Sequence, residues 1–224
     1  MTQHRPLRIL IGSGPTREPI DPVRFISNYS TGYMGARLAS EALARGHRVT
    51  VVSGPSLEPL PRAARIVPVE TAQEMEQALR RLAAQADAVI MAAAVSDFRP
   101  SRLAAAKLKR TERHPRTLRL LATPDILARL PRRKHQTVAG FALETALVLP
   151  RAARKLRERR LDLLVAQEAN GSGTPFGRRP VRAWLLERTG RTVSLGRRSK
   201  AGIARALLDK VEALWYGQRD PKPT

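Results

Sequence analysis

Short apolar segments rich in β-branched residues alternate with amphipathic helical segments along this chain. Residues 7–13 and 48–53 are expected strands, and the continuous apolar run at 87–95 is typical of a central parallel strand buried on both faces. Helices are expected at about 33–45 and from 72 to about 84. Strands joined through helices lie parallel, so the sequence predicts an α/β fold with a Rossmann-like, doubly wound, mostly parallel sheet.

The second half of the chain continues this alternation and adds a hairpin near its end. Strands are expected at 117–122, 137–144 and 161–167, a helix at 150–160, a hairpin at 181–187 and 192–196, and a last helix at 200–215. The hairpin predicts a C-terminal antiparallel addition to the sheet. Since 224 residues suffice for one sizeable core, we expect a single domain over residues 1–224.

Several expected helix ends carry capping residues. Gly46 follows the first helix and suits the left-handed conformation that ends many helices. Thr71 and Glu74 have the spacing of a capping box. Pro124 is expected at the first position of a short helix, and Ser199 is expected to cap the last one.

Composition excludes some classes of protein. The chain has no cysteine, and therefore no disulfide framework and no thiolate nucleophile. Its N-terminal residues lack the apolar segment of a signal peptide, and its longest apolar run, at 88–95, is far too short to span a membrane. We therefore expect a cytoplasmic protein with no membrane partner.

The net charge of +22 is concentrated in one part of the sequence. Residues 1–98 contain 11 basic and 9 acidic residues, whereas residues 99–224 contain 30 and 10. A basic half is compatible with binding of nucleic acid or of phosphorylated ligands. Only 7 of the 41 basic residues are lysines, so a general preference for arginine on solvated helix faces explains most of the charge.

A long irregular loop follows the first strand. The loop, GPTREPIDPVRFISNYSTGYMG, fills residues 14–35. A dinucleotide-binding Rossmann protein joins strand and helix there by a tight GxGxxG turn, whose amides contact a pyrophosphate. Here Gly12 and Gly14 begin such a turn and Pro15 interrupts it. The loop is thus expected to hold a ligand of its own.

Three segments should meet at one edge of the sheet. Ligands of doubly wound sheets bind beyond the carboxyl ends of the strands. The loop around Asn28, the segment after Val95 and the turn after Phe141 all follow expected strands. We expect them to converge on one site.

Seven segments together resemble one family of enzymes. They are GPTREPIDPVRFISNYSTGYMG, VSGP, AAAVSDFRP, KLKR, TPDIL, GFALET and RKLRERRLDLLVAQ, which cover about residues 8–170. In order and content they resemble the phosphopantothenoylcysteine synthetases, the ligases of coenzyme A biosynthesis. In many bacteria this ligase is the C-terminal half of a bifunctional protein with a decarboxylase. No decarboxylase half precedes the match, so a stand-alone ligase is expected.

The resemblance implies a two-step reaction. Members of this family join 4'-phosphopantothenate to L-cysteine. In bacterial members CTP activates the carboxylate to an acyl-cytidylate with release of pyrophosphate, and cysteine then displaces CMP. The implied co-substrate is CTP, although the sequence leaves ATP open, and the implied metal is Mg²⁺. The family is dimeric, so a homodimer is expected.

Three residues are implied in catalysis. Asn28 matches the asparagine that holds the intermediate, a task that suits a neutral carboxamide with two donors and one acceptor. Without the resemblance, an Asx-turn would explain it equally well. Arg24 is a candidate contact to a substrate phosphate or carboxylate, or else a surface arginine. Lys107 matches the first lysine of the family's KxKK segment.

A larger set is implied in nucleotide binding. Its members are Gly12, Gly14, Ser30, Thr31, Gly32, Gly35, Ala93, Ala94, Asp97, Lys107, Lys109, Pro124, Asp125, Phe141, Lys155 and Arg159. Asp97 is the expected Mg²⁺ ligand, with a helix cap as the alternative. Lys155 and Arg159 share a helix face, and Phe141 packs against the base or belongs to the core.

Two positions depart from the family pattern. Family members often carry Lys or Arg where Tyr33 stands, and Arg37 is then the candidate substitute. The second departure is the turn FGRRP at residues 176–180, and the match fades after residue 170.

Two other classes of function remain as alternatives. An NAD(P)-dependent Rossmann oxidoreductase is disfavoured by the interrupted glycine turn and by Ser53 and Gly54, where an acidic residue would close the second strand. A nucleic-acid-binding module is disfavoured because the chain has no recognisable reading motif and only 4% aromatic residues. We therefore expect no nucleic acid partner.

Overall fold

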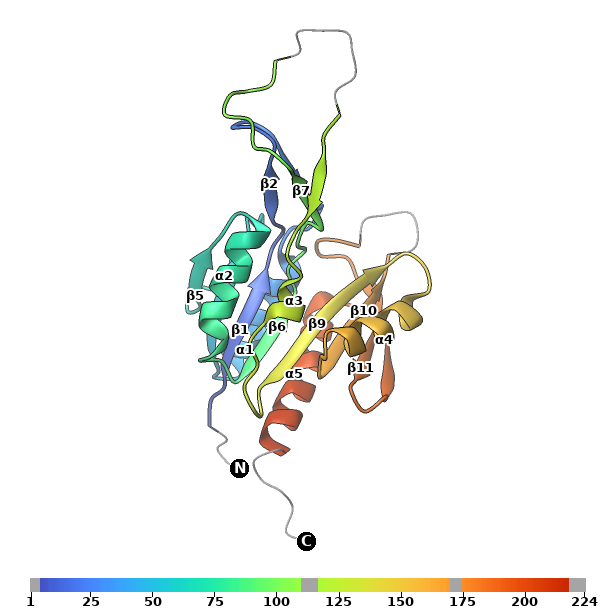
Figure 1. Ribbon diagram of the computed structural model, residues 1–224. Coiled ribbons are helices and arrows are strands. Elements are labelled where there is room, and N and C mark those ends of the chain that lie inside the picture. The colour runs from blue at the N-terminus through green and yellow to red at the C-terminus, as the bar shows by residue number, and fades with distance from the viewer. Residues whose placement is uncertain (1–4, 110–116, 170–174, 218–224) are drawn as a thin grey trace.

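A computed structural model describes residues 5–109, 117–169 and 175–217 (Figure 1). In these ranges an eight-stranded sheet has the order β12-β11-β10-β9-β6-β1-β4-β5. Its strands are β1 (Arg8–Ser13), β4 (Arg48–Ser53), β5 (Arg65–Pro68), β6 (Ala88–Met91), β9 (Thr137–Glu144), β10 (Leu163–Glu168), β11 (Val181–Glu187) and β12 (Thr192–Arg198). Neighbouring strands pair in parallel along the run β5-β4-β1-β6-β9-β10. β11 and β12 add antiparallel pairs beside β10. This confirms the α/β, mostly parallel sheet with a C-terminal antiparallel addition.

Helices cover both faces of the sheet. The helices are α1 (Tyr33–Ala44), α2 (Ala72–Ala83), α3 (Ile126–Arg129), α4 (Val148–Glu158) and α5 (Lys200–Gly217). α1 and α5 share one apolar core with residues such as Ile11, Ile90 and Val165, whereas α2, α3 and α4 share a second core with Leu10, Val89 and others. Alternate residues of the buried strands thus serve the two faces, as the continuous apolar runs predict.

Most of the expected helix ends are confirmed. Gly46 has a φ of 80° just after α1. Thr71 and Glu74 form both hydrogen bonds of a capping box at α2, and the Ser199 hydroxyl accepts from the amide of Gly202 at the start of α5. The expectation for Pro124 is wrong, because the helix cap there is Asp125.

A side-chain hydrogen bond of Asp125 places the start of the helix after Pro124. Its carboxylate accepts a hydrogen bond from the amide of Ala128, which satisfies one of the free donors of the first turn. Pro124 therefore precedes the cap, and α3 begins at Ile126.

Two other expected strands are shorter than the apolar pattern suggests. The run at 87–95 forms a strand only over Ala88–Met91, and the segment at 117–122 only over Leu120–Ala122. Beyond Met91 the chain leaves the ladder for the edge of the sheet, where it contributes to the site. Apolar composition alone cannot distinguish that segment from a strand.

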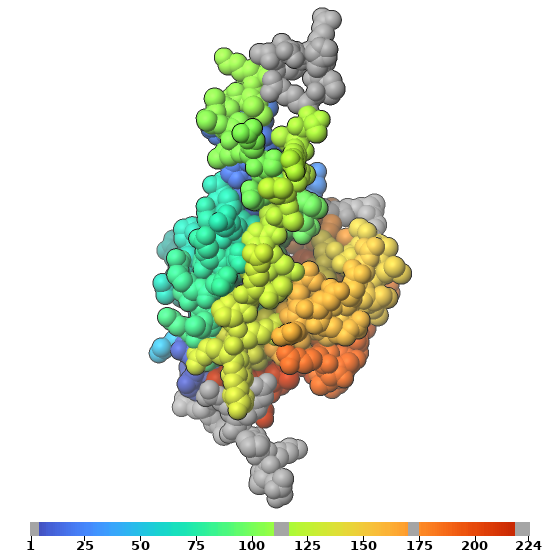
Figure 2. Space-filling model, viewed as in Figure 1, coloured from blue at the N-terminus to red at the C-terminus, as the bar shows by residue number. Residues whose placement is uncertain are grey.

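Four short strands form an arm that projects from the body of the molecule (Figures 1 and 2). They are β2 (Arg17–Pro19), β3 (Phe25–Ser27), β7 (Phe98–Pro100) and β8 (Leu120–Ala122). β2 pairs with β3 and β7 with β8, each as an antiparallel two-stranded sheet. The amide of Ala104 donates to the carbonyl of Ile20 at 3.0 Å and joins the two halves of the arm.

Candidate active site

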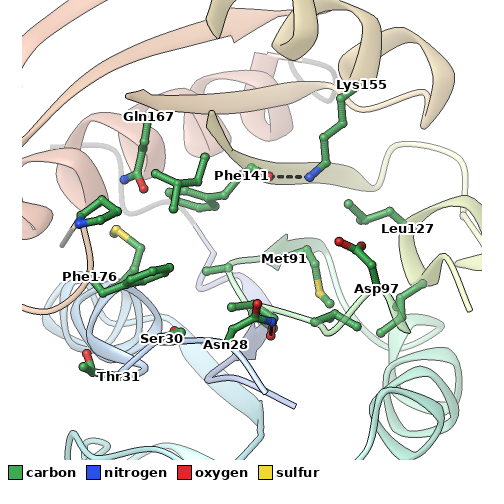
Figure 3. A pocket seen from close by; sticks show the side chains of 18 of the residues that line it. Asn28, Ser30, Thr31, Met91, Asp97, Leu127, Phe141, Lys155, Gln167 and Phe176 are labelled. Atoms are coloured by element: carbon green, nitrogen blue, oxygen red, sulfur yellow. Dashed lines mark hydrogen bonds between the residues drawn. The ribbon is translucent and has the colours of Figure 1, made fainter. Parts of the chain in front are cut away.

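A cavity of about 450 Å³ lies beyond the carboxyl ends of the central parallel strands (Figure 3). In Figure 3, Asn28, Ser30 and Thr31 lie below it, and Gln167, Phe141 and Lys155 lie above it. The residues predicted from the sequence that line it are Asn28, Ser30, Thr31, Ala93, Ala94, Asp97, Pro124, Asp125, Phe141, Lys155 and Arg159. The expected convergence of the three loops on one site is therefore confirmed.

Backbone hydrogen bonds connect the first loop to the segment after β6. The amide of Ala94 donates to the carbonyl of Gly14 at 2.9 Å, and the carbonyl of Ala94 accepts from the amide of Thr16 at 3.2 Å. The Thr16 hydroxyl accepts in turn from the amide of Ser96 at 2.9 Å. The side-chain amide of Asn28 donates to the same Ala94 carbonyl at 2.8 Å. Asn28 is thus held at the cavity by the segment that follows the central strand.

The amino-terminal end of α1 opens toward the cavity. Gly32 precedes the helix with a φ of 81°, a conformation that other residues adopt with strain. Ser30, Thr31 and Tyr33 line the cavity beside this end. The first amides of a helix lack partners within the helix and carry a partial positive charge, so this end can bind an anion.

The four predicted glycines pack closely against neighbouring residues and do not line the cavity. Gly12, Gly14, Gly32 and Gly35 are absent from the residues that line the cavity. A Cβ on Gly35 would lie 2.0 Å from the hydroxyl of Ser13, so glycine allows α1 to approach β1 closely. Their part in nucleotide binding stays a prediction.

Two basic residues of α4 and its C-terminal end line the other side of the cavity. The ammonium of Lys155 donates to the carbonyl of Phe141 at 2.8 Å, and the guanidinium of Arg159 pairs with Asp125 at 2.8 Å. Burial lowers the pKa of Lys155, and the positive charge of Arg159 lowers it further. A bound anion would relieve both effects, so this side of the cavity suits phosphate groups.

Acidic side chains at the cavity are few. Asp97 is exposed at the rim, and its carboxylate has no hydrogen bond or ion pair with another described residue. The carboxylate of Asp125 is already used by α3 and Arg159. Within the described ranges no group of three His, Cys, Asp or Glu residues could hold a metal ion by itself. A cation would therefore share its coordination with a ligand.

The two departures from the family pattern lie together at the cavity. Tyr33 lines it, and so do Phe176 and Gly177 of the FGRRP turn. The guanidinium carbons of Arg37 and Arg178 lie 5.2 and 5.6 Å from the centre of the Tyr33 ring. An aromatic ring flanked by cations thus stands where family members often carry a cation, although neither arginine lines the cavity.

Three predicted residues lie on the arm and do not line the cavity. They are Arg24, Lys107 and Lys109. Arg24 pairs with the buried Asp21 and donates to the carbonyl of Leu108 at 2.8 Å, and the amide of Leu108 donates to Asp21 at 3.1 Å. The hydrogen bond from Arg24 holds the pKa of Asp21 well below its usual range. Arg24 and the two lysines therefore form one basic group on the arm, and their roles stay predictions.

Several residues that line the cavity were not among the predicted site residues. Met34, Met91, Leu127, Phe176, Gln167 and Lys200 are among them. The apolar residues carry no distinctive pattern. Lys200 was detectable, because it occupies an apolar position in the periodicity of its helix, and Gln167 ends an otherwise apolar strand.

A doubly wound sheet with a polar cavity at the carboxyl ends of its strands defines a ligand-binding α/β protein. Residues 5–214 match the family described as the DNA/pantothenate metabolism flavoprotein C-terminal domain, and the chain belongs to that family. The resemblance to the synthetase half of the bifunctional coenzyme A biosynthesis protein is confirmed at this level. None of the helices in the described residues has the length and apolar character needed to cross a membrane.

Individual relatives agree with this family. The coenzyme A biosynthesis bifunctional protein CoaBC of Mycobacterium tuberculosis is 39% identical to this chain, and the match covers 94% of this chain and 53% of that protein. A cysteine/cysteine sulfinic acid decarboxylase from an unknown prokaryotic organism is 37% identical over 92% of this chain and 58% of its own length. The chain thus spans about half the length of the curated relatives it matches.

The solved structures identify which half. The crystal structure of the C-terminal domain of CoaBC superimposes with a TM-score of 0.79 at 34% identity, covering 94% of this chain and 96% of that domain. The DNA/pantothenate metabolism flavoprotein of Streptococcus pneumoniae gives the same TM-score at 25% identity, over 92% of this chain and 99% of its own. The similarity is therefore to the C-terminal half of the bifunctional relatives.

Proposed function

We propose that this protein joins 4'-phosphopantothenate to L-cysteine through an acyl-cytidylate formed from CTP. One observation carries the proposal: a single cavity brings together Asn28, the segment after β6 and the basic pair Lys155 and Arg159. The cavity occurs in a chain that matches the C-terminal domain of a coenzyme A biosynthesis protein over almost its whole length. The similarity to CoaBC proteins of coenzyme A biosynthesis favours the ligase over both rival classes, the oxidoreductase and the nucleic-acid-binding module.

The first step places high negative charge in the cavity. The carboxylate oxygen of phosphopantothenate attacks the α-phosphorus of CTP, and the bond to the bridging oxygen breaks so that pyrophosphate leaves with its electron pair. Lys155, Arg159 and the amino-terminal end of α1 supply positive charge around the cavity. Fixed positive groups in a partly desolvated site stabilise such a transition state.

The second step forms the amide. The cysteine amine attacks the acyl carbon, the bond from carbon to the phosphate oxygen breaks, CMP leaves with the electron pair, and the amine loses a proton. Asn28 supports this assignment because its carboxamide is neutral and has donor and acceptor capacity beyond its bond to the Ala94 carbonyl. A neutral group can hold the anhydride without trapping it as an ion pair.

The residues at the cavity fit a magnesium ion bound with the nucleotide. Mg²⁺ usually binds one or two carboxylates together with phosphate oxygens and water. Asp97 offers one carboxylate that is not used by any other described residue. We propose Asp97 as its protein ligand, where the ion would neutralise phosphate charge.

We also propose that residues 1–224 form one domain and that the protein is a homodimer that associates through the arm. Seven large apolar side chains of the described residues are exposed there: Val23, Phe25, Phe98, Leu103, Leu118, Leu120 and Leu121. Exposed apolar groups on short two-stranded sheets favour association with another chain. Lys107 can bind the nucleotide only if the arm reaches a cavity, and the arm of a second copy meets that need.

The test follows pyrophosphate release from CTP with and without 4'-phosphopantothenate, with ATP in parallel, followed by addition of cysteine. We expect release that requires phosphopantothenate and an amide product that requires cysteine. Equal rates with ATP would remove the preference for CTP and leave the ligase. Tight binding of NADPH with no nucleotide-dependent release would overturn the assignment. A cytoplasmic location stays a prediction.

A further inference from the structure

The buried face of α5 contains a lysine. Ile203, Ala204 and Leu207 lie on that face and are fully buried in the core shared with α1. Lys200 stands one turn before them, at the start of the helix, and is only 4% exposed. It also lines the cavity. The apolar face of α5 thus continues into the cavity as a cation.

Strand β10 shows the same pattern, an apolar row that ends in a polar residue. Leu163 and Val165 point into the core of α1 and α5, and Gln167 is the next residue of that row at the carboxyl end. Gln167 is 7% exposed and lines the cavity. Its side-chain nitrogen is buried without a hydrogen-bond partner among the residues described. Two core-facing rows therefore end in polar groups beside the same cavity.

Neither group is explained by the residues that the structure describes. Lys200 has no hydrogen bond or ion pair with any residue in the described ranges. Burial lowers the pKa of its ammonium to about 8, because a buried site solvates the charge poorly. A buried unpaired cation destabilises a fold, and such groups mark ligand sites when they line a cavity.

We propose that Lys200 and Gln167 form a phosphate-binding corner of the cavity. The ammonium and the side-chain amide group present N–H donors, and the positive end of the α5 helix dipole lies at the same place. A group rich in anionic oxygens satisfies all of them. This inference rests on the proposed function, since both substrates of that reaction carry phosphate.

The cavity has two separate basic regions that match two phosphorylated substrates. Lys155 comes from α4, on one face of the sheet, and Lys200 comes from α5, on the other. Figure 3 shows Gln167 and Lys155 at opposite ends of the cavity, with Phe141 between them. The corner therefore binds either a phosphate of the nucleotide or the 4'-phosphate of phosphopantothenate.

The test compares Lys200→Met and Lys200→Arg with Lys210→Met, a control on the same helix outside the cavity. Calorimetry measures binding of pyrophosphate, CTP, cytidine, 4'-phosphopantothenate and pantothenate. Because a hydrogen bond to a charged group contributes about 1.5–3 kcal/mol, Lys200→Met should weaken one phosphorylated ligand about ten- to a hundredfold. Lys200→Arg should retain much of the affinity, and Lys210→Met should retain all of it.

The pairs of ligands identify the source of the phosphate. Weaker CTP binding with unchanged phosphopantothenate assigns the corner to the nucleotide, and the reverse assigns it to the other substrate. Cytidine and pantothenate should bind equally to wild type and Lys200→Met. Lys200→Met should also melt at a higher temperature than wild type, which a merely structural lysine would not produce.

Unchanged affinity for every phosphorylated ligand in a folded Lys200→Met protein would overturn the proposed phosphate-binding corner. If that variant does not fold, Gln167→Met removes the other donor, and unchanged binding there is equally decisive. Failure of the proposed function looks different. A wild-type protein that binds pyrophosphate through Lys200 but releases none from CTP would keep the corner and lose the ligase.

Discussion

The body and the arm of this molecule differ in how they are held together. The body has helices on both faces of its sheet, and its two apolar cores are fully buried. The arm consists of two-stranded sheets with exposed apolar side chains such as Phe98 and Leu103. Two-stranded sheets are marginal by themselves in water. The body thus forms its cavity within one chain, whereas the apolar side chains of the arm stay exposed, which supports the proposed association with a second copy.

The predicted site residues divide along the same line. Asn28, Asp97, Lys155 and Arg159 line the cavity of the body. Lys107 lies on the arm beside Arg24, which is fixed there by Asp21. If both groups serve one reaction, substitutions in the cavity should weaken ligand binding whether or not the chain is assembled. Substitutions on the arm should weaken it only in the assembled protein.

The largest effect is expected for Asn28→Asp. A carboxylate there would face the Ala94 carbonyl, which now accepts from the side-chain amide at 2.8 Å, and would repel a phosphate anhydride in the cavity. We expect the overall rate to fall about 10²-fold or more, as for removal of an oxyanion-type donor. CTP affinity should change little. Quenched-flow measurement of pyrophosphate and of the amide product separates the two steps.

The matched control for this variant is Tyr29→Phe, because Tyr29 is the next residue and does not line the cavity. It should behave as wild type. Near wild-type rates of both steps in Asn28→Asp would mean that the long loop holds something other than the intermediate.

A smaller effect should distinguish the two lysines. Lys155→Met removes a partly buried cation from the body, so the Kd for CTP should rise about tenfold or more at any protein concentration. Lys107→Gln should weaken CTP-dependent activation only where the protein is assembled. KM for CTP is measured at protein concentrations above and below the range in which the dimer dissociates, and sedimentation gives that range. An unchanged KM and kcat in Lys107→Gln would remove this lysine from the site.

Mixing two impaired variants tests the proposed partner directly. If Lys107 serves the cavity of a second copy, hybrids of Asn28→Asp and Lys107→Gln contain one intact site each. In an equal mixture that assembles at random, about half of the dimers are hybrids, and one of their two sites is intact. About a quarter of all sites should therefore be restored. No recovery on mixing, or an active monomer in sedimentation, would place both residues in one chain.

The sequence allowed prediction of the body far better than of the arm. Residues 48–53 and 137–144 were predicted as strands with the observed bounds, because their apolar patterns and flanking turns act locally. The segment after Met91 was assigned to the strand, since its alanines are equally suited to a loop that approaches a ligand. The position of Lys107 depends on Asp21, which contacts Leu108 across 87 positions of sequence. No local pattern encodes such a contact.

The site was predictable where chemistry and position coincide. Asn28 and Asp97 follow strands, so the topology alone placed them at one edge. Lys200 was not predicted, although a lysine at a core position of an amphipathic helix is a visible anomaly. A lysine at a core position can therefore indicate a functional site as a motif does, because a buried charge without a partner is destabilising.

The smallest effect is expected from a change that touches the body alone. Thr71→Ala removes the hydroxyl that accepts from the amide of Glu74 at the start of α2, a helix that does not line the cavity. Loss of such a cap lowers the free energy of unfolding by about 1 kcal/mol, or about 2–4 °C in Tm for a chain of this length. Activity and the dimer dissociation constant should stay unchanged, and Thr71→Ser should restore the Tm. Calorimetry and sedimentation provide the two readouts. A shift in dimer dissociation alongside the Tm would mean that the arm and the body are coupled, and the contrast between them would then fail.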